Sequence, residues 1–417
     1  MKAEIIAVGS ELLTPFRLDT NSLFLTSELN QVGLRVVHKA VVGDAPDEMC
    51  LSFRHALGRA DVVVSSGGLG PTDDDRTRQT VADLLGRKLH VNDEVLQSIR
   101  ERFRRFGRAM PQINERQAQV IEGAVVLKNP RGTAPGLWIE SRGKIIVLLP
   151  GVPAELRELM EREVKPRLLA LGLPERLYTR ELRITGIFES DVEQRVSPLY
   201  AEYPDSDTTI LAAPTGIQLH PRVWSGDPAK AEKMLDEMVS RMSLALGEYL
   251  FSTKGESLEQ IVAHLLIENH ATIAVAESCT GGLLAERLTS VAGSSAYFLG
   301  GAVVYSNDLK TSMAGVPAEL IESKGAVSAE VAQALASGIR KRTGATLGLG
   351  VTGIAGPGGG TPEKPVGLVH LAIADQRGAR ETAIQLPGDR ERIRMFSTQR
   401  ALDLVRRYFL FPAHGRA

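Results

Sequence analysis

The stretch ATIAVAESCTGGLLAERL, residues 271–288, decides the fold that we predict for the second half of this chain. Its apolar run at residues 273–276 predicts a buried strand, which breaks at residues 277–282 and gives way to a helical pattern. A strand-to-helix turn gathers backbone N–H groups at the positive end of a helix, where a phosphate or a developing oxyanion is stabilised. Ser278 and Cys279 lie in this turn, and each is a potential nucleophile.

A purely structural interpretation of the turn is also open. In that interpretation Thr280 is the N-cap of the helix, and Gly281 and Gly282 serve packing. A thiol at a helix N-terminus can be reactive, but Cys279 can equally be a small buried residue behind the strand. Residue chemistry alone does not choose between Ser278 and Cys279.

Two further strands are expected to end beside this turn. The sequence GGAVVYSNDLK at residues 300–310 predicts a strand that ends near Tyr305, and LGLGVTGIAGPGGG at residues 347–360 predicts a strand that opens into a glycine-rich loop. In an open α/β sheet, ligands bind at the carboxyl ends of the strands. Lys310 with a lowered pKa could then activate Ser278, with Tyr305 close to both. The alternative is that Lys310 is a solvated surface charge.

The first part of the chain alternates strand and helix patterns, which indicates a parallel α/β sheet. A strand–loop–helix pattern at residues 145–160 repeats the design, and Pro153 suits its first helical turn. The other expected elements are strands at residues 3–9, 34–44 and 61–75, the last opening into a loop, and helices at residues 21–32 and 47–60.

The loop GGLGPTDDD at residues 67–75 carries the second chemical signal. Its first half offers backbone N–H groups to a phosphate at Gly67, Gly68, Gly70 and Thr72. The three aspartates that follow suit water or a hard divalent cation. They are equally typical of an acidic helix start.

Between residues 175 and 249 the pattern changes to a strand, a helix at residues 189–200, two short strands and a second helix, which indicates a small α+β domain. The G-x-x-G clamp of RNA-binding modules is absent, because Gly186 is followed three places on by Glu189. A structural or dimer-forming role is therefore favoured, and residues 251–257 are expected to link this domain to the next.

The whole chain has 417 residues, too many for one ordinary core, so two or three domains are expected. A net charge of -1 with 43% hydrophobic residues argues against a dedicated nucleic-acid or membrane-surface protein. Two cysteines give no disulfide framework, and we find neither a signal-peptide pattern nor a membrane span. The expectation is a soluble, cytoplasmic protein.

In this order, the segments AESCTGG, VVYSNDLK, GAVS, TGIAGPGGG, KPVG and GDR resemble the nicotinamide mononucleotide deamidase family. The resemblance implies hydrolysis of the nicotinamide amide to the acid and ammonia, in pyridine nucleotide salvage and without a cofactor. It implies Ser278 as nucleophile, Lys310 as general base and Tyr305 as its partner. The expected oxyanion and substrate-binding positions are Thr280, Gly281, Gly282, Thr352, Gly353 and Arg390.

The segments GSELL, DTN, VGD, GGLGPTDDD, GTAPG and LPGVP resemble the molybdopterin-binding, MoaB-like domain of the CinA family, and the middle segment resembles the KH-like insert of that family. One departure is Pro15-Phe16-Arg17, where the family usually has a glycine-led, more polar loop. The expected domains are residues 1–174 (MoaB-like), 175–250 (KH-like) and 256–417 (deamidase).

For the N-terminal domain the resemblance implies metal-dependent ADP-ribose pyrophosphatase activity. A divalent cation (magnesium, manganese or cobalt) would be bound at Asp74 and Asp75, and phosphate at Gly67, Gly68, Gly70 and Thr72. The resemblance also implies a homodimer, and we expect neither membrane association nor direct nucleic-acid binding.

Two other functions stay open. The N-terminal domain could bind a pterin nucleotide, as in molybdenum cofactor assembly. The whole chain could be a non-catalytic nucleotide- or molybdopterin-binding protein of competence or DNA-damage responses.

Overall fold

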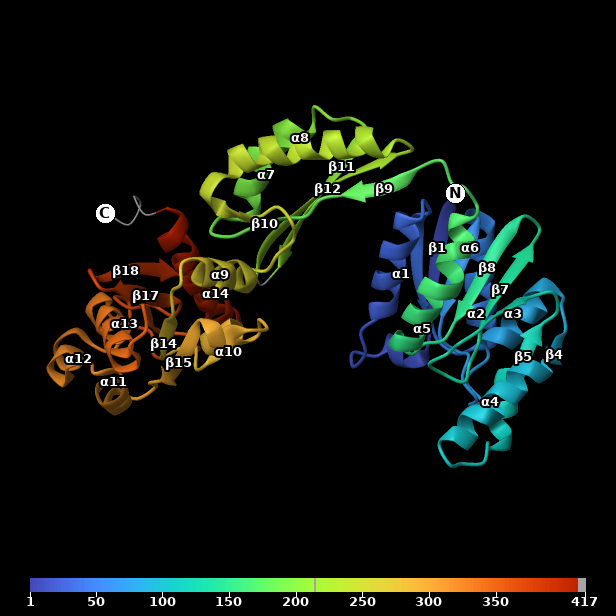
Figure 1. Cartoon of the computed structure of the whole chain (residues 1–417), viewed down its shortest axis with the longest axis horizontal. Coiled ribbons are helices and arrows are strands. Elements are labelled where there is room, and N and C mark those ends of the chain that lie inside the picture. The colour runs from blue at the N-terminus through green and yellow to red at the C-terminus, as the bar shows by residue number, and fades with distance from the viewer. Residues whose placement is uncertain (214, 412–417) are drawn as a thin grey trace. The chain divides into compact units, whose positions relative to one another are not determined.

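The computed structural model describes residues 1–213 and 215–411. The chain forms two compact units (Figure 1). The first contains Met1–Tyr178 and Trp224–Ala231, and the second contains Thr179–Val223 and the chain from Glu232 onward. None of the described helices has an apolar stretch long enough to cross a bilayer.

The first unit contains a mixed sheet of order β2-β1-β3-β8-β7-β6. The first four strands are parallel, as the sequence predicts, whereas β7 and β6 are antiparallel additions. Two short strands, β4 and β5, pair with each other outside this sheet. The strand bounds are β1 (Lys2–Val8), β2 (Arg35–Val42), β3 (Val62–Ser66), β4 (Leu89–Val91), β5 (Gln119–Ile121), β6 (Val125–Leu127), β7 (Gly136–Ser141) and β8 (Lys144–Leu149).

Helices cover both faces of this sheet. Leu25 and Leu156, from α1 and α5, pack in the core on one face, and Phe53 and Val81, from α2 and α3, pack in the core on the other. Pro153 begins α5, as predicted. The helix bounds are α1 (Thr20–Gln31), α2 (Pro46–Arg59), α3 (Thr77–Leu85), α4 (Asp93–Arg105), α5 (Pro153–Leu159) and α6 (Lys165–Leu169).

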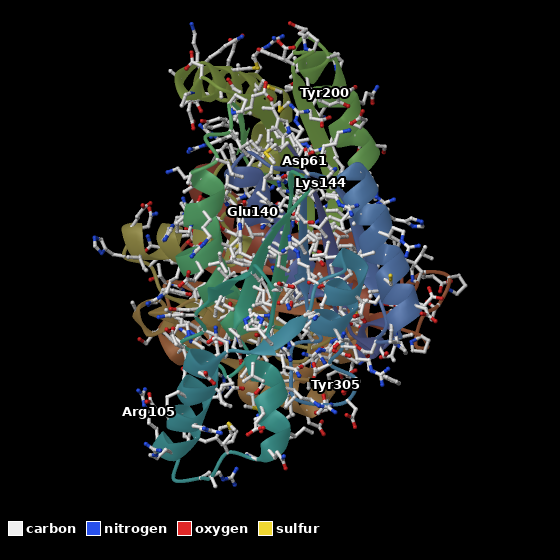
Figure 2. The ribbon with its side chains drawn as sticks, turned by 90° about the vertical axis from the view of Figure 1, so that its right-hand side faces the viewer. Asp61, Arg105, Glu140, Lys144, Tyr200 and Tyr305 are labelled. Carbon is white, nitrogen blue, oxygen red and sulfur yellow. The ribbon has the colours of Figure 1, made fainter. Side chains whose placement is uncertain are left out.

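The amino ends of β3 and β8 lie side by side, where Asp61 and Lys144 are neighbours (Figure 2). The N–H of Ile145 donates to the carbonyl of Asp61 at 2.9 Å. Because β3 and β8 are parallel, their carboxyl ends also meet, and residues 67–75 and 150–153 leave the sheet together at that opposite edge.

The second unit begins with the small α+β domain. Its elements follow the predicted order of strand, helix, two strands and helix. Residues 251–257, expected to be a linker, begin inside the sheet, because β13 pairs antiparallel with β10. The bounds, which include the preceding β9, are β9 (Arg176–Thr179), β10 (Leu182–Ile184), α7 (Glu189–Tyr200), β11 (Ser206–Ala213), β12 (Gly216–Ser225), α8 (Pro228–Leu246) and β13 (Leu250–Ser252).

The C-terminal sheet has the order β15-β14-β16-β17-β18. Strands β15, β14 and β16 are parallel, so the three predicted strand ends do meet at one edge. Strands β17 and β18 continue the sheet in antiparallel pairing. The bounds are β14 (Ile273–Glu277), β15 (Phe298–Val303), β16 (Leu347–Gly353), β17 (Leu368–Asp375) and β18 (Gly378–Gln385).

Successive residues of β16 face opposite sides of the sheet, and helices cover both sides. Leu347 and Leu349 face the core under α9, α10 and α14. Gly348 faces α13, and a Cβ there would lie 2.0 Å from the carbonyl oxygen of Ala336, so only glycine permits this close packing. The helices are α9 (Leu258–Glu268), α10 (Leu283–Thr289), α11 (Asn307–Ala314), α12 (Ala318–Lys324), α13 (Ala329–Thr343) and α14 (Arg390–Leu410).

A buried arginine joins α14 to the end of the middle domain. Arg406 is 1% exposed and donates to the Asp403 carboxylate at 2.8 Å. Its other nitrogens donate to the carbonyls of Glu248 at 2.5 Å and Leu250 at 3.4 Å. One side chain therefore satisfies three acceptors on two parts of the chain.

We expect Arg406→Met to lower the free energy of unfolding by about 3 kcal/mol, because it leaves buried acceptors unpaired. Urea unfolding of the full chain measures the effect. Lys341→Met is the matched control, since Lys341 is exposed on α13. Equal stability of the two variants would contradict a stabilising role for Arg406.

Candidate active site

Ser278 lies directly after β14, at the edge where the three parallel strands end. Its N–H donates to the carbonyl of Val351 on β16 at 3.0 Å, and the residue is 8% exposed. Gly281 and Gly282 follow with φ angles of 60° and 95°, a left-handed backbone that favours glycine. The two glycines therefore allow the chain to turn sharply from β14 into α10.

The carboxylate of Glu277 holds this turn in place. It is 1% exposed and accepts the N–H groups of Gly282 at 3.0 Å, Leu284 at 3.0 Å and Ala285 at 2.8 Å. The predicted N-cap, Thr280, is wrong: the N-cap position is Gly282, and no side chain caps it there. Glu277 satisfies the helix start instead, because its charged acceptor reaches several amides at once.

Cys279 and Thr280 are the residues of the turn whose N–H groups no described residue accepts. The N–H of Gly281 donates to the carbonyl of Ser278 at 3.2 Å, and the N–H of Gly282 is bound by Glu277. The buried hydroxyl of Thr280 has no partner, and no described residue accepts its N–H. Thr280 is 0% exposed whereas Gly281 is exposed, so the unused groups of Thr280 lie beneath the surface of the turn.

Lys310 lies near the start of α11. The alternative interpretation, in which Lys310 is a solvated surface charge, is wrong. It is 2% exposed, and its Nζ donates to the carbonyl of Tyr305 at 3.0 Å. No carboxylate of the described residues lies within ion-pair distance of it. Burial lowers the pKa of Lys310, so the neutral amine is favoured relative to a lysine in water.

Cys279 is a poor nucleophile in this structure. Burial, supported by the charge of Glu277, raises the pKa of its thiol to about 12. The thiol therefore stays protonated at neutral pH, and a protonated thiol is unreactive. The N–H of Val304 donates to the carbonyl of Glu277 at 2.7 Å, so the segment that holds the Lys310 amine lies beside the turn that carries Ser278.

Arg390 connects Tyr305 to the glycine-rich loop. Its guanidinium donates to the Tyr305 hydroxyl at 3.0 Å and to the carbonyl of Gly356 at 2.9 Å. Tyr305 is 57% exposed at the surface (Figure 2). These contacts join the residues that follow β15, the loop that follows β16 and the start of α14. The three segments are far apart in the sequence but meet at one edge of the sheet.

The predicted position Thr352 and the first residue of the KPVG segment, Lys364, support loops. The Thr352 hydroxyl donates to the carbonyl of Ala326 at 2.7 Å, and Lys364 donates to the carbonyls of Lys324 and Val327. Gly353 ends β16 opposite Val369. These contacts hold residues 324–328 against the end of β16.

Two residues at this site had no role assigned from the sequence. One is Glu277, whose position just before the turn was the only signal. The other is Arg394, which donates to the carbonyl of Thr280 at 2.7 Å. Arg394 follows Arg390 by four residues, which places both on one face of α14. That spacing places Arg394 near Arg390, but it does not indicate the contact with Thr280.

The glycine-rich loop of the N-terminal domain is closed by its own aspartate. The Asp75 carboxylate accepts the N–H of Gly70 at 2.7 Å, the N–H of Thr72 at 2.9 Å and the Thr72 hydroxyl. The N–H of Gly67 donates to Leu149 at 2.9 Å. Among the described residues, no acceptor reaches the N–H of Gly68, which stays available to an anion.

A cavity of about 510 Å³ lies beside this loop and contains several carboxylates. Within the described part of the chain, no three His, Cys, Asp or Glu side chains are placed to hold a metal ion by themselves. A hard cation such as magnesium commonly binds one or two carboxylates and completes its shell with substrate phosphates, and that donor set fits here. The carboxylates that line the cavity are Glu11, Asp44, Asp74, Asp75 and Glu155.

Family models match three parts of the chain. Residues 4–170 match a probable molybdopterin binding domain, residues 179–252 match the damage-inducible protein CinA KH domain, and residues 255–409 match the CinA C-terminal domain.

Among solved structures, the protein CinA from Thermoplasma acidophilum is 37% identical, with a TM-score of 0.37 over 40% of this chain and 96% of that chain. Similar full-length relatives include a CinA-like protein of Solibacter usitatus, 48% identical over 98% of both chains. Another, from Acidobacterium capsulatum, is 50% identical over 98% of this chain and 99% of its own. The chain belongs to the CinA family.

Proposed function

We propose that the C-terminal domain hydrolyses the amide of nicotinamide mononucleotide to nicotinate mononucleotide and ammonia. Ser278 is the nucleophile and Lys310 the general base. The observation that carries this proposal is the buried Lys310 amine, which has no carboxylate partner among the described residues and lies beside the serine turn. The raised pKa of Cys279 supports the choice of serine over the neighbouring thiol.

In the first half of this reaction, the neutral Lys310 amine takes the proton of Ser278 as the hydroxyl oxygen attacks the amide carbon. The tetrahedral intermediate carries a negative oxygen, and the N–H groups of Cys279 and Thr280, which no described residue accepts, are suited to stabilise it. Protonated Lys310 then gives its proton to the leaving nitrogen, which departs as ammonia.

In the second half, water attacks the acyl-enzyme and gives its proton to Lys310. The carbon–oxygen bond to Ser278 breaks, the serine recovers its proton, and nicotinate mononucleotide leaves. Arg390 is suited to the phosphate of the nucleotide, because it lies exposed at the same edge. Its contacts to Tyr305 and Gly356 also fix its orientation.

For the N-terminal domain we propose metal-dependent hydrolysis of ADP-ribose to AMP and ribose 5-phosphate. The support is the carboxylate-lined cavity beside the N–H of Gly68. A bound divalent cation would neutralise pyrophosphate charge and lower the pKa of a water molecule. Asp74 lies exposed at this cavity, whereas Asp75 holds the loop.

The alternative for the whole chain is nucleotide or molybdopterin binding without turnover. The buried amine of Lys310 argues against it, because a binding protein gains nothing from an unpaired lysine beside a serine. Release of ammonia from nicotinamide mononucleotide separates the two functions.

We expect Ser278→Ala to lower the rate of ammonia release by about 10⁴-fold or more, as loss of a nucleophile does. Cys279→Ala should keep the rate within about tenfold, because the protonated thiol takes no part. A coupled ammonia assay measures both. The reverse pattern would make Cys279 the nucleophile.

The stability of the protein should report the titration of Lys310. Its folded-state pKa lies below 10.5, so between the two values the unfolded state binds more protons and the free energy of unfolding rises with pH. Relative to Lys310→Met, the wild type should therefore gain stability from pH 7 to pH 10 in urea unfolding. Lys341→Met, which removes an exposed lysine, should follow the wild type. If the stability of Lys310→Met also changes with pH as that of the wild type does, the pKa of Lys310 is not lowered in the folded protein.

Asp74→Asn should abolish AMP formation from ADP-ribose while ammonia release continues unchanged. Removal of divalent cations by a chelator should have the same effect on the wild type. Asp93→Asn on α4 is the control, since Asp93 lines neither the cavity beside residues 67–75 nor the one beside α2. AMP formation that resists the chelator would contradict the proposed metal dependence.

A further inference from the structure

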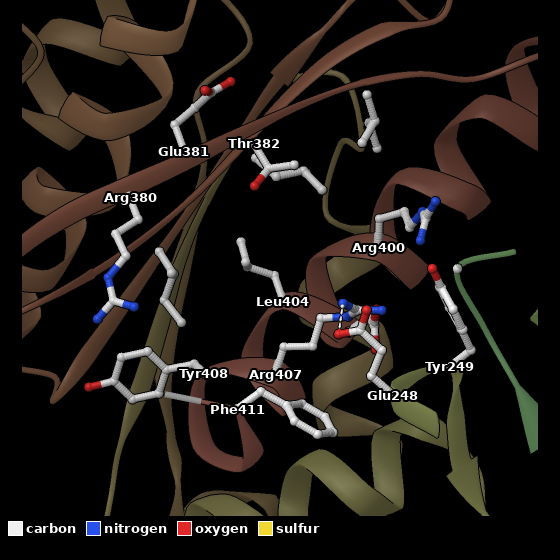
Figure 3. A pocket seen from close by; sticks show the side chains of 15 residues that line it. Glu248, Tyr249, Arg380, Glu381, Thr382, Arg400, Leu404, Arg407, Tyr408 and Phe411 are labelled. Carbon is white, nitrogen blue, oxygen red and sulfur yellow. Dashed lines mark hydrogen bonds and ion pairs between the residues drawn. The ribbon is translucent and has the colours of Figure 1, made fainter. Parts of the chain in front are cut away.

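A second cavity in the C-terminal unit lies between the β17–β18 pair, the second half of α14 and the end of the middle domain. Its volume of about 390 Å³ is within the range of small-molecule sites. Leu371, Ile373 and Leu404 give it an apolar wall. In Figure 3, Arg400 and Tyr249 lie at one end and Arg380 and Tyr408 at the other. None of the residues of the Ser278 turn lines it.

Arg400 is the unusual side chain of this cavity. It is half-buried, and no described residue forms a hydrogen bond or an ion pair with its guanidinium. A Cβ on Gly186 would lie 2.7 Å from its Nη1, so the guanidinium rests against a stretch of bare backbone. Withdrawing a charge from water without a partner is unfavourable, and burial accordingly lowers the pKa of Arg400.

The carboxylates near Arg400 already have other partners. Asp403 binds Arg406 and Arg407, and Arg407 also binds Glu248 at 2.8 Å. Glu381, near the other end, is paired with His370. Arg380 forms no ion pair with the described residues, and its guanidinium stacks on the ring of Tyr408 at 5.6 Å. Two guanidinium groups of the cavity, those of Arg380 and Arg400, therefore form no ion pair with the described residues, although three carboxylates also line it.

We propose that this cavity binds a small organic anion of the mononucleotide class. The anionic group binds the planar fork of Arg400, which suits phosphate or carboxylate oxygens. The apolar body of the ligand packs against Ile373 and Leu404. Arg400 is ten residues beyond Arg390 on α14, a distance of about 15 Å along the helix, so this site is separate from the proposed catalytic one.

Isothermal titration calorimetry of the full chain with AMP tests this site. Arg400→Met keeps the volume of the side chain and removes its charge, and we expect it to weaken AMP binding by about tenfold or more. Arg392→Met is the matched control, because Arg392 lies exposed on the same helix outside the cavity. Adenosine and inorganic phosphate should each bind more weakly than AMP, since each provides only half of the interactions.

Thermal unfolding without ligand separates binding from a structural role. An unpaired Arg400 should make no contribution to stability, so Arg400→Met should melt at or above the wild-type temperature. Arg400→Lys, which keeps the charge and loses the fork, should fold normally and bind AMP several-fold more weakly. The proposal is overturned if Arg400→Met and Arg392→Met bind AMP equally. It is also overturned if phosphate alone binds as tightly as AMP.

Discussion

The hydrogen bonds from the start of α10 to Glu277 are the interaction on which the C-terminal site depends. A buried carboxylate that accepts three amides fixes the chain between β14 and α10, and each bond to a charged acceptor contributes about 1.5–3 kcal/mol. The same charge helps to raise the pKa of Cys279. It also occupies the N–H of Gly282, so the unused N–H groups of the turn are those of Cys279 and Thr280.

The N-terminal domain uses a carboxylate in the same way. Asp75 binds the amides of Gly70 and Thr72 and closes the loop after β3, as Glu277 closes the turn after β14. In both places the sequence motif is typical of an anion site, because glycines have no side chain to cover their backbone N–H groups. In the folded chain an acidic side chain already takes most of these amides, and only single positions such as Gly68 and Thr280 stay available.

Hydrophobic patterning predicted the parallel strands of both large domains and the order of elements in the middle one, because that information is local. The antiparallel strands β6 and β7 and the pairing of β13 were missed. Strands β6 and β13 have three residues each, and such short strands carry almost no periodicity. At the site, the sequence indicated Ser278, Lys310 and Arg390. It could not indicate that Lys310 is buried, because burial depends on how the elements pack. Nor could it indicate that Arg394 reaches Thr280, because that contact joins residues 114 positions apart.

The arginines of α14 differ in how many of their five N–H donors the protein itself uses. Each of the three nitrogens of Arg406 donates to a carboxylate or a carbonyl, and Arg394 is bound to the turn at Thr280. Arg390 gives two donors to neighbouring loops and keeps the rest at an exposed edge. Arg400 gives none to any described residue. Because an unpaired guanidinium is unfavourable when half-buried, the unused donors, and not the charges alone, identify where α14 can hold a ligand.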